Sequence, residues 1–282
     1  MKKIGIIDYF IDEWHSNEYL KLFKKASEEL KLDYEIAYAY AEVEMEGRLS
    51  TNEWCAKNGI VRCENIDELC AKSDNILILA PANPETHLRY AKAALQYGKS
   101  TYIDKTFAPD LKTAKEIFDI AEKNNVKIFS TSALRYAKEL DGLENAKSVI
   151  FTGGGRSLEE YIIHQIEMAV RLMGKAATDI RVFNMEKQAT VVIDFSGKLA
   201  TLNYSYSDCN FSVDAQLDAR QRCTYRCIED DGYFYTLAKT ILTFFETEKL
   251  PFLKEETLYV IAIRDAIMEG INAEIGEKIK IK

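Results

Sequence analysis

The chain has 282 residues, 47% of them hydrophobic and 29% charged, a composition typical of a soluble protein long enough for two domains. Its formal net charge is −8, and its acidic and basic residues are mixed along the chain, without the basic patch of proteins that bind nucleic acid or anionic membranes, so we expect neither partner. No apolar run is long enough to span a membrane, and the N-terminal segment turns acidic too soon for a signal peptide, so we expect a cytoplasmic protein.

The first half of the chain alternates between strand and helix patterns. Apolar or alternating runs predict the strands, and apolar residues at helical spacing predict the helices. The expected strands lie at residues 3–7, 34–41, 76–79, 100–103 and 126–129, and the expected helices at residues 17–30, 52–58, 67–72, 87–97 and 111–124. Short connections between these elements indicate an α/β fold, and we predict a Rossmann-like doubly wound parallel sheet over residues 1–133.

The pattern changes after residue 133. Ser196-Gly197 is typical of a two-residue hairpin between two strands. Strand-like runs follow one another without helices between them at residues 179–187, 189–195, 199–206, 211–218 and 223–228, and helices at residues 164–173, 233–247 and 255–272 are expected to cover one face of the resulting sheet. We therefore predict an α+β domain with an open antiparallel sheet over residues 134–282, packed closely on the first domain with a cleft between them.

Charged residues follow one of the buried strands. Asp104, Lys105 and Thr106 come directly after the strand at residues 100–103. Open α/β sheets bind ligands at the carboxyl ends of their parallel strands, so this charged pair lies where a site is expected. The alternative interpretation of Lys105 is a surface lysine paired with Asp104.

Several segments resemble motifs of one family. ILILAPANPETH resembles a strand followed by Pro-Asn and His, and AALQYGKSTYIDKTFA resembles an Ala-Gly-Lys run that leads to Glu-Lys-Pro. GGGRSLEEYIIHQIEMAVRLMG resembles a glycine-rich turn followed by Asp-x-x-x-His and a helix, and LYVIAIRDAIMEGINAEIGEKIKI resembles a final helix and strand. In this order the segments resemble the glucose-fructose oxidoreductase and inositol dehydrogenase family (Gfo/Idh/MocA).

The resemblance implies an NAD(P)-dependent oxidoreductase that transfers a hydride between nicotinamide and a sugar, polyol or related small hydroxyl or carbonyl compound. By position, Lys105 is expected to orient the substrate hydroxyl, and His164 is the expected general acid or base. Glu160 lies four residues before His164 and is expected to orient its ring. Arg135 and Tyr136 are expected to contact the substrate. The resemblance also implies a homodimer or higher homo-oligomer formed through the C-terminal sheet.

The first strand-to-helix turn departs from the family. A dinucleotide fingerprint G-x-G-x-x-G is expected after Ile7, but its glycine positions hold Asp8, Phe10 and Glu13. Phenylalanine blocks the close approach of backbone to a pyrophosphate, and each carboxylate repels a phosphate by about 1 to 4 kcal/mol at about 4 Å. Asp8, Phe10 and Ile11 are therefore expected to contact the cofactor in a binding mode that differs from that of the glycine fingerprint. The sequence does not distinguish NAD from NADP.

Other cofactor candidates follow other strands. Glu42 comes after the second strand, where a carboxylate binds the ribose of NAD, although its acidic run is more typical of a solvated surface. Pro81, Asn83 and His87 lie where the resemblance places the nicotinamide half, and the alternative is a proline-punctuated helix start with a packed or capping His87. The full set of expected cofactor-binding residues is Asp8, Phe10, Ile11, Glu42, Pro81, Asn83, His87, Asp104 and Lys105.

Structural alternatives also exist for the other candidates. His164 on its own is more typical of a packed or surface histidine, but it is one of only three in the chain and follows the triplet Gly153-Gly154-Gly155. A structural ion pair explains Arg135 equally well. The cysteines lack the spacing of a zinc site or the density of a disulfide scaffold, so we expect reduced, mostly packed thiols and no metal. They are Cys55, Cys63, Cys70, Cys209, Cys223 and Cys227.

Two classes of function therefore remain open. The first is an NAD(P)-linked oxidoreductase that has rebuilt its phosphate-binding turn, and Lys105 and His164 favour it. The second is a catalytically degenerate relative that binds a small ligand or a protein without redox chemistry, and Asp8, Phe10 and Glu13 favour it. We favour the first, because chance explains the retention of both family side chains less easily than it explains a divergent turn.

Overall fold

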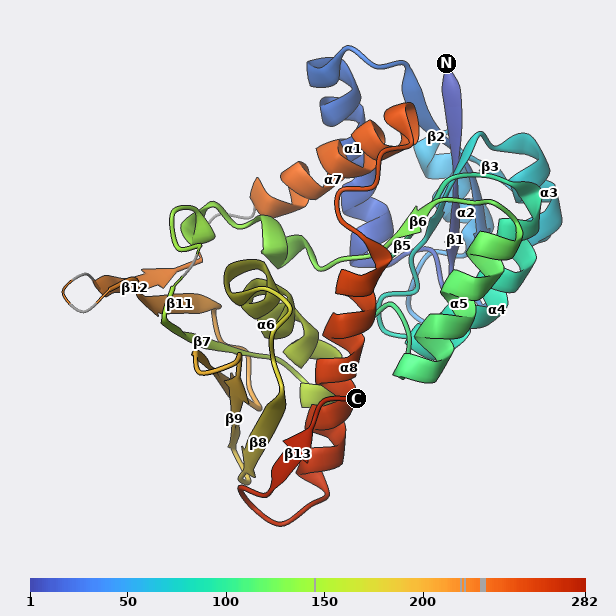
Figure 1. Cartoon of the computed structure of the whole chain (residues 1–282). Coiled ribbons are helices and arrows are strands. Elements are labelled where there is room, and N and C mark those ends of the chain that lie inside the picture. Colours follow the sequence, from blue (N-terminus) through green and yellow to red (C-terminus); the bar gives the residue numbers. More distant parts are fainter. Residues whose placement is uncertain (145, 219, 221, 229–231) are drawn as a thin grey trace. The chain divides into compact units, whose positions relative to one another are not determined.

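The computed structural model of the chain describes residues 1–144, 146–218, 220, 222–228 and 232–282, and only the backbone of residues 222–225. Its contacts divide the chain into two compact units. The first unit comprises Met1–Thr131 and Phe234–Lys254, and the second comprises Ser132–Tyr233 and Glu255–Lys282. In Figure 1 the elements from β1 to β6, coloured blue to green, belong to the first unit.

A six-stranded parallel sheet forms the centre of the first unit, in the order β3-β2-β1-β4-β5-β6. Its strands are β1 (Lys2–Asp8), β2 (Tyr34–Ala41), β3 (Val61–Arg62), β4 (Asn75–Ile78), β5 (Thr101–Ile103) and β6 (Ile128–Phe129). The strand order reverses between β1 and β4, which makes their carboxyl ends the switch point where such sheets bind ligands. The predicted doubly wound parallel sheet is confirmed.

Helices connect these strands, and side-chain caps fix several of their starts. Ser50 and Glu53 form a capping box at α2, and Asp110 caps α5. Helix α1 begins at Trp14, earlier than the expected residue 17, because Glu13 caps it. The helices are α1 (Trp14–Leu30), α2 (Thr51–Asn58), α3 (Ile66–Lys72), α4 (Pro84–Ala94), the 3-10 helix η1 (Leu95–Tyr97) and α5 (Leu111–Lys123).

Helix α7 (Gly232–Thr247), orange in Figure 1, packs in the first unit from Phe234 onward, although it follows the second sheet in the sequence. The ring of Phe244 lies 5.0 Å from that of Phe129 in β6, and Tyr235 donates a hydrogen bond to Glu29 of α1. The prediction that this helix covers the antiparallel sheet is wrong. Apolar periodicity identifies a buried helix face, but it does not identify the sheet on which that face packs.

A seven-stranded sheet forms the second unit, in the order β12-β11-β7-β10-β9-β8-β13. Its strands are β7 (Ser148–Gly154), β8 (Asp179–Asn184), β9 (Gln188–Asp194), β10 (Leu199–Ser205), β11 (Ser212–Gln216), β12 (Arg222–Cys227) and β13 (Lys278–Lys280). The sheet is mixed, because β7 and β10 run parallel whereas the other described pairs are antiparallel. The predicted hairpin at Ser196-Gly197 joins β9 to β10 and is confirmed by positive φ angles of 54° and 92°.

Strand β7 is not predicted by the sequence pattern, since its last residues are glycines that are more typical of a turn. Gly153 and Gly154 instead continue the strand alongside β10. A Cβ atom on Gly154 would lie 2.6 Å from the Ser205 carbonyl oxygen, so only glycine permits this close approach. The glycine triplet is therefore required by packing in the second unit.

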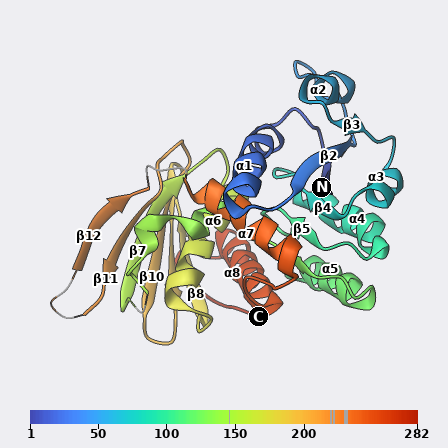
Figure 2. The ribbon, with the colours of Figure 1, turned by 90° about the horizontal axis from the view of Figure 1, so that it is seen from above.

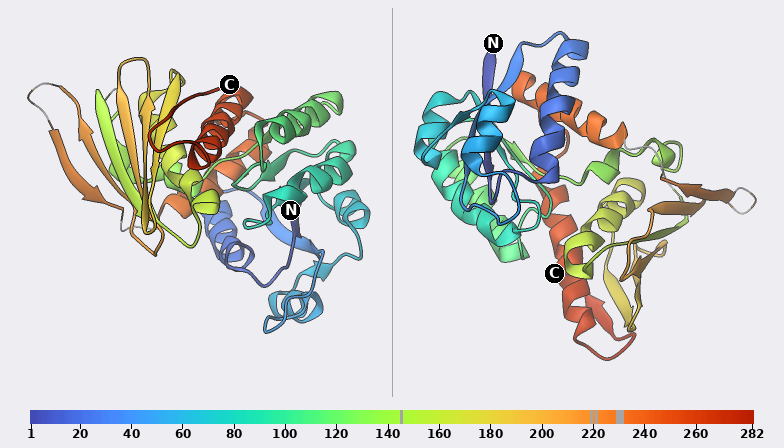
Figure 3. Two further views of the ribbon diagram at one scale, coloured as in Figure 1. Left: turned by 90° about the horizontal axis from the view of Figure 1, so that it is seen from below. Right: turned by 180° about the vertical axis from the view of Figure 1, so that it is seen from behind.

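Helices α6 (Leu158–Met173) and α8 (Lys254–Ile271) lie on one face of the second sheet (Figures 2 and 3). Within the described residues no helix covers the other face, where Ile150, Phe183 and Leu199 are 45%, 38% and 48% exposed. Two 3-10 helices precede the sheet, η2 (Ala133–Tyr136) and η3 (Lys138–Leu140). None of the helices in the described ranges combines the length and the apolar character needed to cross a bilayer.

Candidate functional site

Asp8 ends β1 at the carboxyl edge of the first sheet, and its side chain is buried. Its Oδ1 atom accepts hydrogen bonds from the backbone N–H groups of Tyr9 (2.7 Å) and Ala80 (3.0 Å), and its Oδ2 atom accepts one from the Ser16 hydroxyl (2.7 Å). Ala80 has a φ of 44°, a left-handed conformation that is uncommon for a residue with a Cβ atom. One carboxylate therefore joins β1, the loop after β4 and α1.

Glu13 caps the N-terminus of α1. Its Oε1 atom accepts a hydrogen bond from the Ser16 N–H group (2.6 Å), and its Oε2 atom is 3.0 Å from His15 Nδ1. The other ring nitrogen of His15, Nε2, is 3.8 Å from Asp104 Oδ2. We call Asp8, Glu13 and Asp104 the carboxylate cluster. Its members are 1%, 8% and 2% exposed, so three acidic side chains are buried at this edge.

The two carboxyls nearest α1 differ in their affinity for a proton. Burial, and then the nearby charge of Glu13, raise the pKa of Asp8 well above its ordinary value. Burial acts on Glu13 in the same direction, but the hydrogen bond and charge of His15 outweigh it, and the pKa of Glu13 is lowered. A proton is therefore bound more readily by Asp8 than by Glu13.

Replacement of Asp8 by Asn is expected to stabilise the protein at about pH 8 and to have no such effect at about pH 4. A carboxyl whose pKa is raised by folding favours the folded state only while it is protonated, so its contribution is lost as the pH rises through the raised pKa. The Asn amide can still accept from Tyr9 and Ala80 and donate to Ser16. Urea unfolding at both pH values measures the difference, and a gain that grows toward acidic pH would contradict the raised pKa.

Lys105 follows Asp104 after β5 and is 8% exposed. Its Nζ atom donates a hydrogen bond to the Pro81 carbonyl (3.0 Å) in the loop after β4, and Asp104 Oδ1 accepts one from the Tyr102 hydroxyl (2.9 Å). Lys105 is therefore a buried lysine at the switch-point edge, unlike the surface lysine of the alternative interpretation. A buried ammonium group in such a place can stabilise negative charge on a bound oxygen atom.

His87 is completely buried and serves the loops around it. Its Nε2 atom is 2.8 Å from the Leu79 carbonyl oxygen, and its Nδ1 atom is 3.1 Å from the Phe107 carbonyl oxygen. Both ring nitrogens thus face the backbone of the loops after β4 and β5. This placement favours the packed histidine over the cofactor-binding one.

Two further cofactor candidates have protein partners at α4. Asn83 precedes the helix, and its Nδ2 atom donates to Glu85 (2.9 Å). Glu42 accepts hydrogen bonds from Arg89 (2.5 Å) and from the Tyr90 hydroxyl (2.6 Å). The carboxylate that the sequence assigns to a ribose is therefore already paired with α4.

These contacts decide how a dinucleotide pyrophosphate fits the first unit. In Rossmann domains the pyrophosphate binds backbone N–H groups at this turn and at the start of the helix. Here the Ser16 N–H group is bonded to Glu13. Phe10, at a glycine position, is half-buried, and Ile11 packs in the core with 1% exposure. The turn does not fit a pyrophosphate in the position that the glycine fingerprint gives it.

His164 lies on α6 in the second unit, and its Nδ1 atom is 2.6 Å from the Ser132 hydroxyl. Ser132 is fully buried, and its hydroxyl also accepts a hydrogen bond from the Leu134 N–H group (3.2 Å). The imidazole meets the rings of Tyr161 and Phe211 edge-on, at centroid distances of 5.8 and 5.5 Å. These contacts fix the orientation of the ring, as a general acid or base requires.

Glu160 was expected to orient that ring, but it pairs with Arg156 instead. Arg156 Nε donates to Glu160 Oε2 (2.6 Å), and Arg156 Nη2 donates to Glu160 Oε1 (2.5 Å). Both carboxylate oxygens are thus engaged away from His164. Ser132 takes the orienting position that the sequence assigned to Glu160.

Arg135 is held by carboxylates of the second unit. Its Nη1 atom donates to Glu167 Oε2 (2.8 Å), its Nη2 atom pairs with Glu256 of α8, and its side chain is 12% exposed. Glu167 also accepts a hydrogen bond from the Ser132 N–H group (3.3 Å). The structural ion pair therefore accounts for Arg135, which supports the segment that carries Ser132. Tyr136, the neighbouring substrate candidate, is half-buried.

Two residues of these sites are not singled out by the sequence analysis. His15 lies between Glu13 and Asp104, and Ser132 lies against His164. His15 could have been identified locally, because it follows a glutamate just before the start of a predicted helix. Ser132 and His164 are 32 residues apart, so no local pattern identifies the second.

The cysteines form no candidate site in the described residues. The free thiols among the described side chains are Cys55, Cys63, Cys70, Cys209 and Cys227. The side chain of Cys223 lies outside the described part. Burial raises the pKa of Cys55 to about 11 and that of Cys70 to about 12, which disfavours thiolate chemistry. Among the side chains that the structure describes, no three His, Cys, Asp or Glu residues are grouped as metal ligands.

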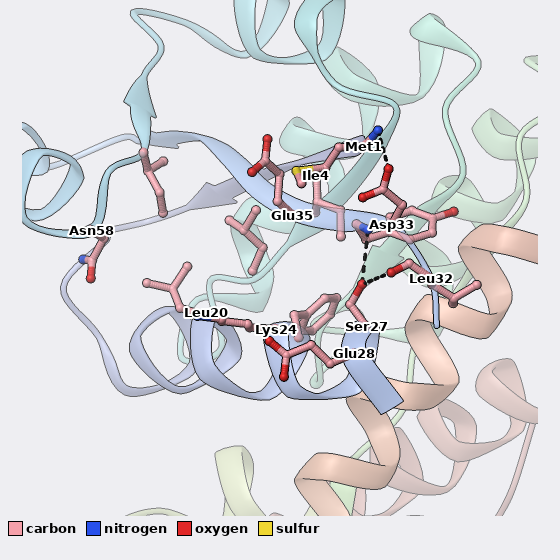
Figure 4. A pocket seen from close by; sticks show the side chains of 14 residues that line it. Met1, Ile4, Leu20, Lys24, Ser27, Glu28, Leu32, Asp33, Glu35 and Asn58 are labelled. Carbon is pink, nitrogen blue, oxygen red and sulfur yellow. Dashed lines mark hydrogen bonds and ion pairs between the residues drawn. The ribbon is translucent and has the colours of Figure 1, made fainter. Parts of the chain in front are cut away.

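A pocket of about 420 Å³ lies between α1 and β2, at the amino-terminal edge of the first sheet (Figure 4). Leu20, Ser27 and Ile36 are among its lining residues. The amino group of Met1 pairs with Asp33 (2.6 Å), and both residues also line the pocket. None of the predicted site residues lines it, so it is separate from the candidate site at the carboxyl edge.

Part of the first unit matches a known family model. Residues 15–132 match an oxidoreductase family with an NAD-binding Rossmann fold, GFO_IDH_MocA. The uncharacterized oxidoreductase YhhX of Escherichia coli is 33% identical over 64 residues, which are 23% of this chain and 19% of that protein. An uncharacterized oxidoreductase of Schizosaccharomyces pombe is 30% identical over 101 residues, 36% of this chain and 26% of that protein. The chain thus matches about a fifth to a quarter of the length of these relatives.

Solved structures resemble the whole chain. An oxidoreductase from Agrobacterium radiobacter, crystallised with NAD+, L-tartaric acid and magnesium, has a TM-score of 0.80 at 14% identity, over 99% of this chain and 98% of that one. The UDP-N-acetylglucosamine 3-dehydrogenase GnnA from Acidithiobacillus ferrooxidans has a TM-score of 0.77 at 14% identity, over 95% and 97% of the two chains. At this identity the likeness shows the fold alone.

Proposed function

We propose, from the premise that the chain belongs over residues 15–132 to the Gfo/Idh/MocA oxidoreductase family, that it exchanges a hydride between NAD or NADP and a hydroxyl or carbonyl group of a sugar, polyol or related small molecule. The observation that carries the proposal is the buried ammonium group of Lys105 at the carboxyl edge of the family's NAD-binding fold. Ligands of open α/β sheets bind at this edge.

The chain's own residues supply the charge and the proton for such a reaction. Lys105 stabilises the negative charge that develops on the substrate oxygen atom. His164 removes or delivers the proton of that oxygen atom, because imidazole titrates near neutral pH. Ser132 holds the His164 ring in one orientation. Lys105 belongs to the first unit and His164 to the second.

The similar structures support this substrate class and a nicotinamide cofactor. The Agrobacterium radiobacter protein holds NAD+ and L-tartaric acid, and the Acidithiobacillus ferrooxidans protein is a dehydrogenase of a sugar nucleotide. The apolar side chains on the open face of the second sheet, Ile150, Phe183 and Leu199, support a homodimer or higher homo-oligomer formed through that face.

Titration of the full chain with NADH and NADPH tests the proposal. We expect saturable binding of one of them, detected by nicotinamide fluorescence and by a rise in melting temperature, since a ligand that binds the native state stabilises it. A screen of polyols and keto-sugars should then give turnover that Lys105→Met abolishes. Lys112→Met, which changes an exposed lysine of α5, is the matched control and should keep the activity. Absence of binding at millimolar cofactor would contradict the proposal.

The carboxylate cluster favours a second function. A chain that places Asp8 and Glu13 at the pyrophosphate turn suits a relative that binds a small ligand or a protein without redox chemistry. The variant Lys105→Met separates the two functions, because an oxidoreductase should lose turnover whereas a binding protein should retain its affinity for its partner.

A further inference from the structure

The N-terminus of α1 offers the donors that hold an anion in related folds, and here the chain itself provides the anion. Backbone N–H groups in the first turn of a helix point out of its N-terminal end and favour negative charge there. Glu13 Oε1 accepts the hydrogen bond of the Ser16 N–H group at 2.6 Å. The side chain of Glu13 therefore occupies a place where a phosphate oxygen would bind.

Asp8 completes this arrangement from the end of β1. It accepts hydrogen bonds from the Tyr9 and Ala80 N–H groups and from the Ser16 hydroxyl. Ser16 is thus bonded to Glu13 through its backbone and to Asp8 through its side chain, so the two carboxylates share one residue of α1. They fill the turn together from two different elements.

The neighbouring basic side chains are already engaged by the chain's own groups. His15 lies between Glu13 and Asp104, at 3.0 and 3.8 Å, and the ammonium group of Lys105 donates to the Pro81 carbonyl. A diphosphate would add negative charge to a buried site with three carboxylates and these two basic groups. Without rearrangement it would meet bonded donors and unfavourable charge at the same time.

We propose that Asp8 and Glu13 are the resident anions of this turn, which exclude a diphosphate from the N-terminus of α1 and admit one when both side chains are neutral amides. The proposal does not depend on the redox reaction, because it concerns the binding of phosphate alone. For a dinucleotide it implies that the affinity comes from contacts other than those between its pyrophosphate and α1.

The test compares, at about pH 8, the full-length wild-type protein with the double variant Asp8→Asn/Glu13→Gln, using inorganic pyrophosphate and ADP as probes. Calorimetry should show no saturable binding to the wild type at millimolar probe. The double variant should bind the probe saturably, with an affinity at least about tenfold above the limit that this sets for the wild type. Glu18→Gln/Glu28→Gln removes the same formal charge from other positions of α1 and is the matched control. It should behave as the wild type, which separates the loss of charge at the turn from the change in net charge of the helix.

Hydrogen exchange of the backbone amides at residues 13–17 places the binding. Added pyrophosphate should protect these amides in the double variant and leave them unchanged in the wild type. Protection in the wild type, or equal affinities in the double variant and the control, would overturn the proposal. If the double variant does not fold, Glu13→Gln alone gives the same comparison, since it removes the carboxylate bonded to the Ser16 N–H group.

The outcomes separate this proposal from the proposed function. Absence of turnover with NADH and NADPH would contradict the proposed oxidoreductase function, and the pyrophosphate comparison would still test the role of Asp8 and Glu13. Turnover in a wild-type protein whose residues 13–17 are protected by pyrophosphate would contradict the proposal that Asp8 and Glu13 exclude a diphosphate. The proposed oxidoreductase function would then still stand.

Discussion

Replacement of His164 by Gln is expected to lower kcat by about 10²–10⁴-fold, the usual contribution of a general acid or base. Glutamine is similar in length and keeps a polar group near Ser132, but it cannot exchange a proton near neutral pH. Because His164 is half-buried at the surface of α6, the fold should be kept. Steady-state kinetics with the substrate found in the screen, together with the melting temperature, measures both effects.

Glu160→Gln is the matched control for this prediction. It changes a side chain of the same helix four residues earlier, whose carboxylate is bonded to Arg156 and not to His164. We expect kcat to remain within a few-fold of the wild type. An equal loss in both variants would show that helix α6, and not the imidazole, is responsible.

Replacement of Glu167 by Leu is expected to lower the free energy of unfolding by about 3 kcal/mol. Breaking a buried ion pair leaves its other charge without compensation, and the remaining Glu256 places the expected loss at the lower end of the range for such pairs. The Ser132 N–H group also loses an acceptor. Urea unfolding measures the change.

The double variant Arg135→Met/Glu167→Leu should recover part of that loss, because it removes the buried charge of Arg135 that Glu167→Leu leaves partly uncompensated. It leaves Glu256 without its Arg135 partner, so the recovery is expected to be incomplete. Glu160→Gln serves here as the surface control, since its partner Arg156 is 63% exposed and such pairs contribute about 0–1 kcal/mol. A double variant no more stable than Glu167→Leu would mean that lost packing, and not the buried charge, causes the effect.

The parallel sheet could be predicted from local sequence patterns. The assignment of α7 to the first unit and the existence of strand β7 could not. Ile76, Leu77 and Ile78 are completely buried, and an unbroken apolar run is what a strand covered on both faces requires. In β7 the glycines satisfy a close approach to β10, a partner about fifty residues away in the sequence. Such close contacts depend on which strands lie side by side in the fold, and a local sequence pattern does not identify them.

The candidate site shows the same limit. The position of Lys105 after a buried strand could be predicted, because strand ends are defined by their own residues. The positions of Asp8 and Glu13 indicate repulsion of a phosphate, but the bonds that both make to Ser16 depend on the path of the turn. The partner of His164 depends on the segment after β6, which packs on α6 only in the folded second unit.

The first unit is assembled from two stretches of chain that are made at different times. Met1–Thr131 emerges from the ribosome long before Phe234–Lys254 does, and until then Phe129 lacks the rings of Phe244 and Phe252. N-terminal domains usually fold as soon as they are synthesised. Here the edge strand β6 is expected to remain incompletely covered while the whole second sheet is translated, so the nascent chain should need chaperone protection during that interval.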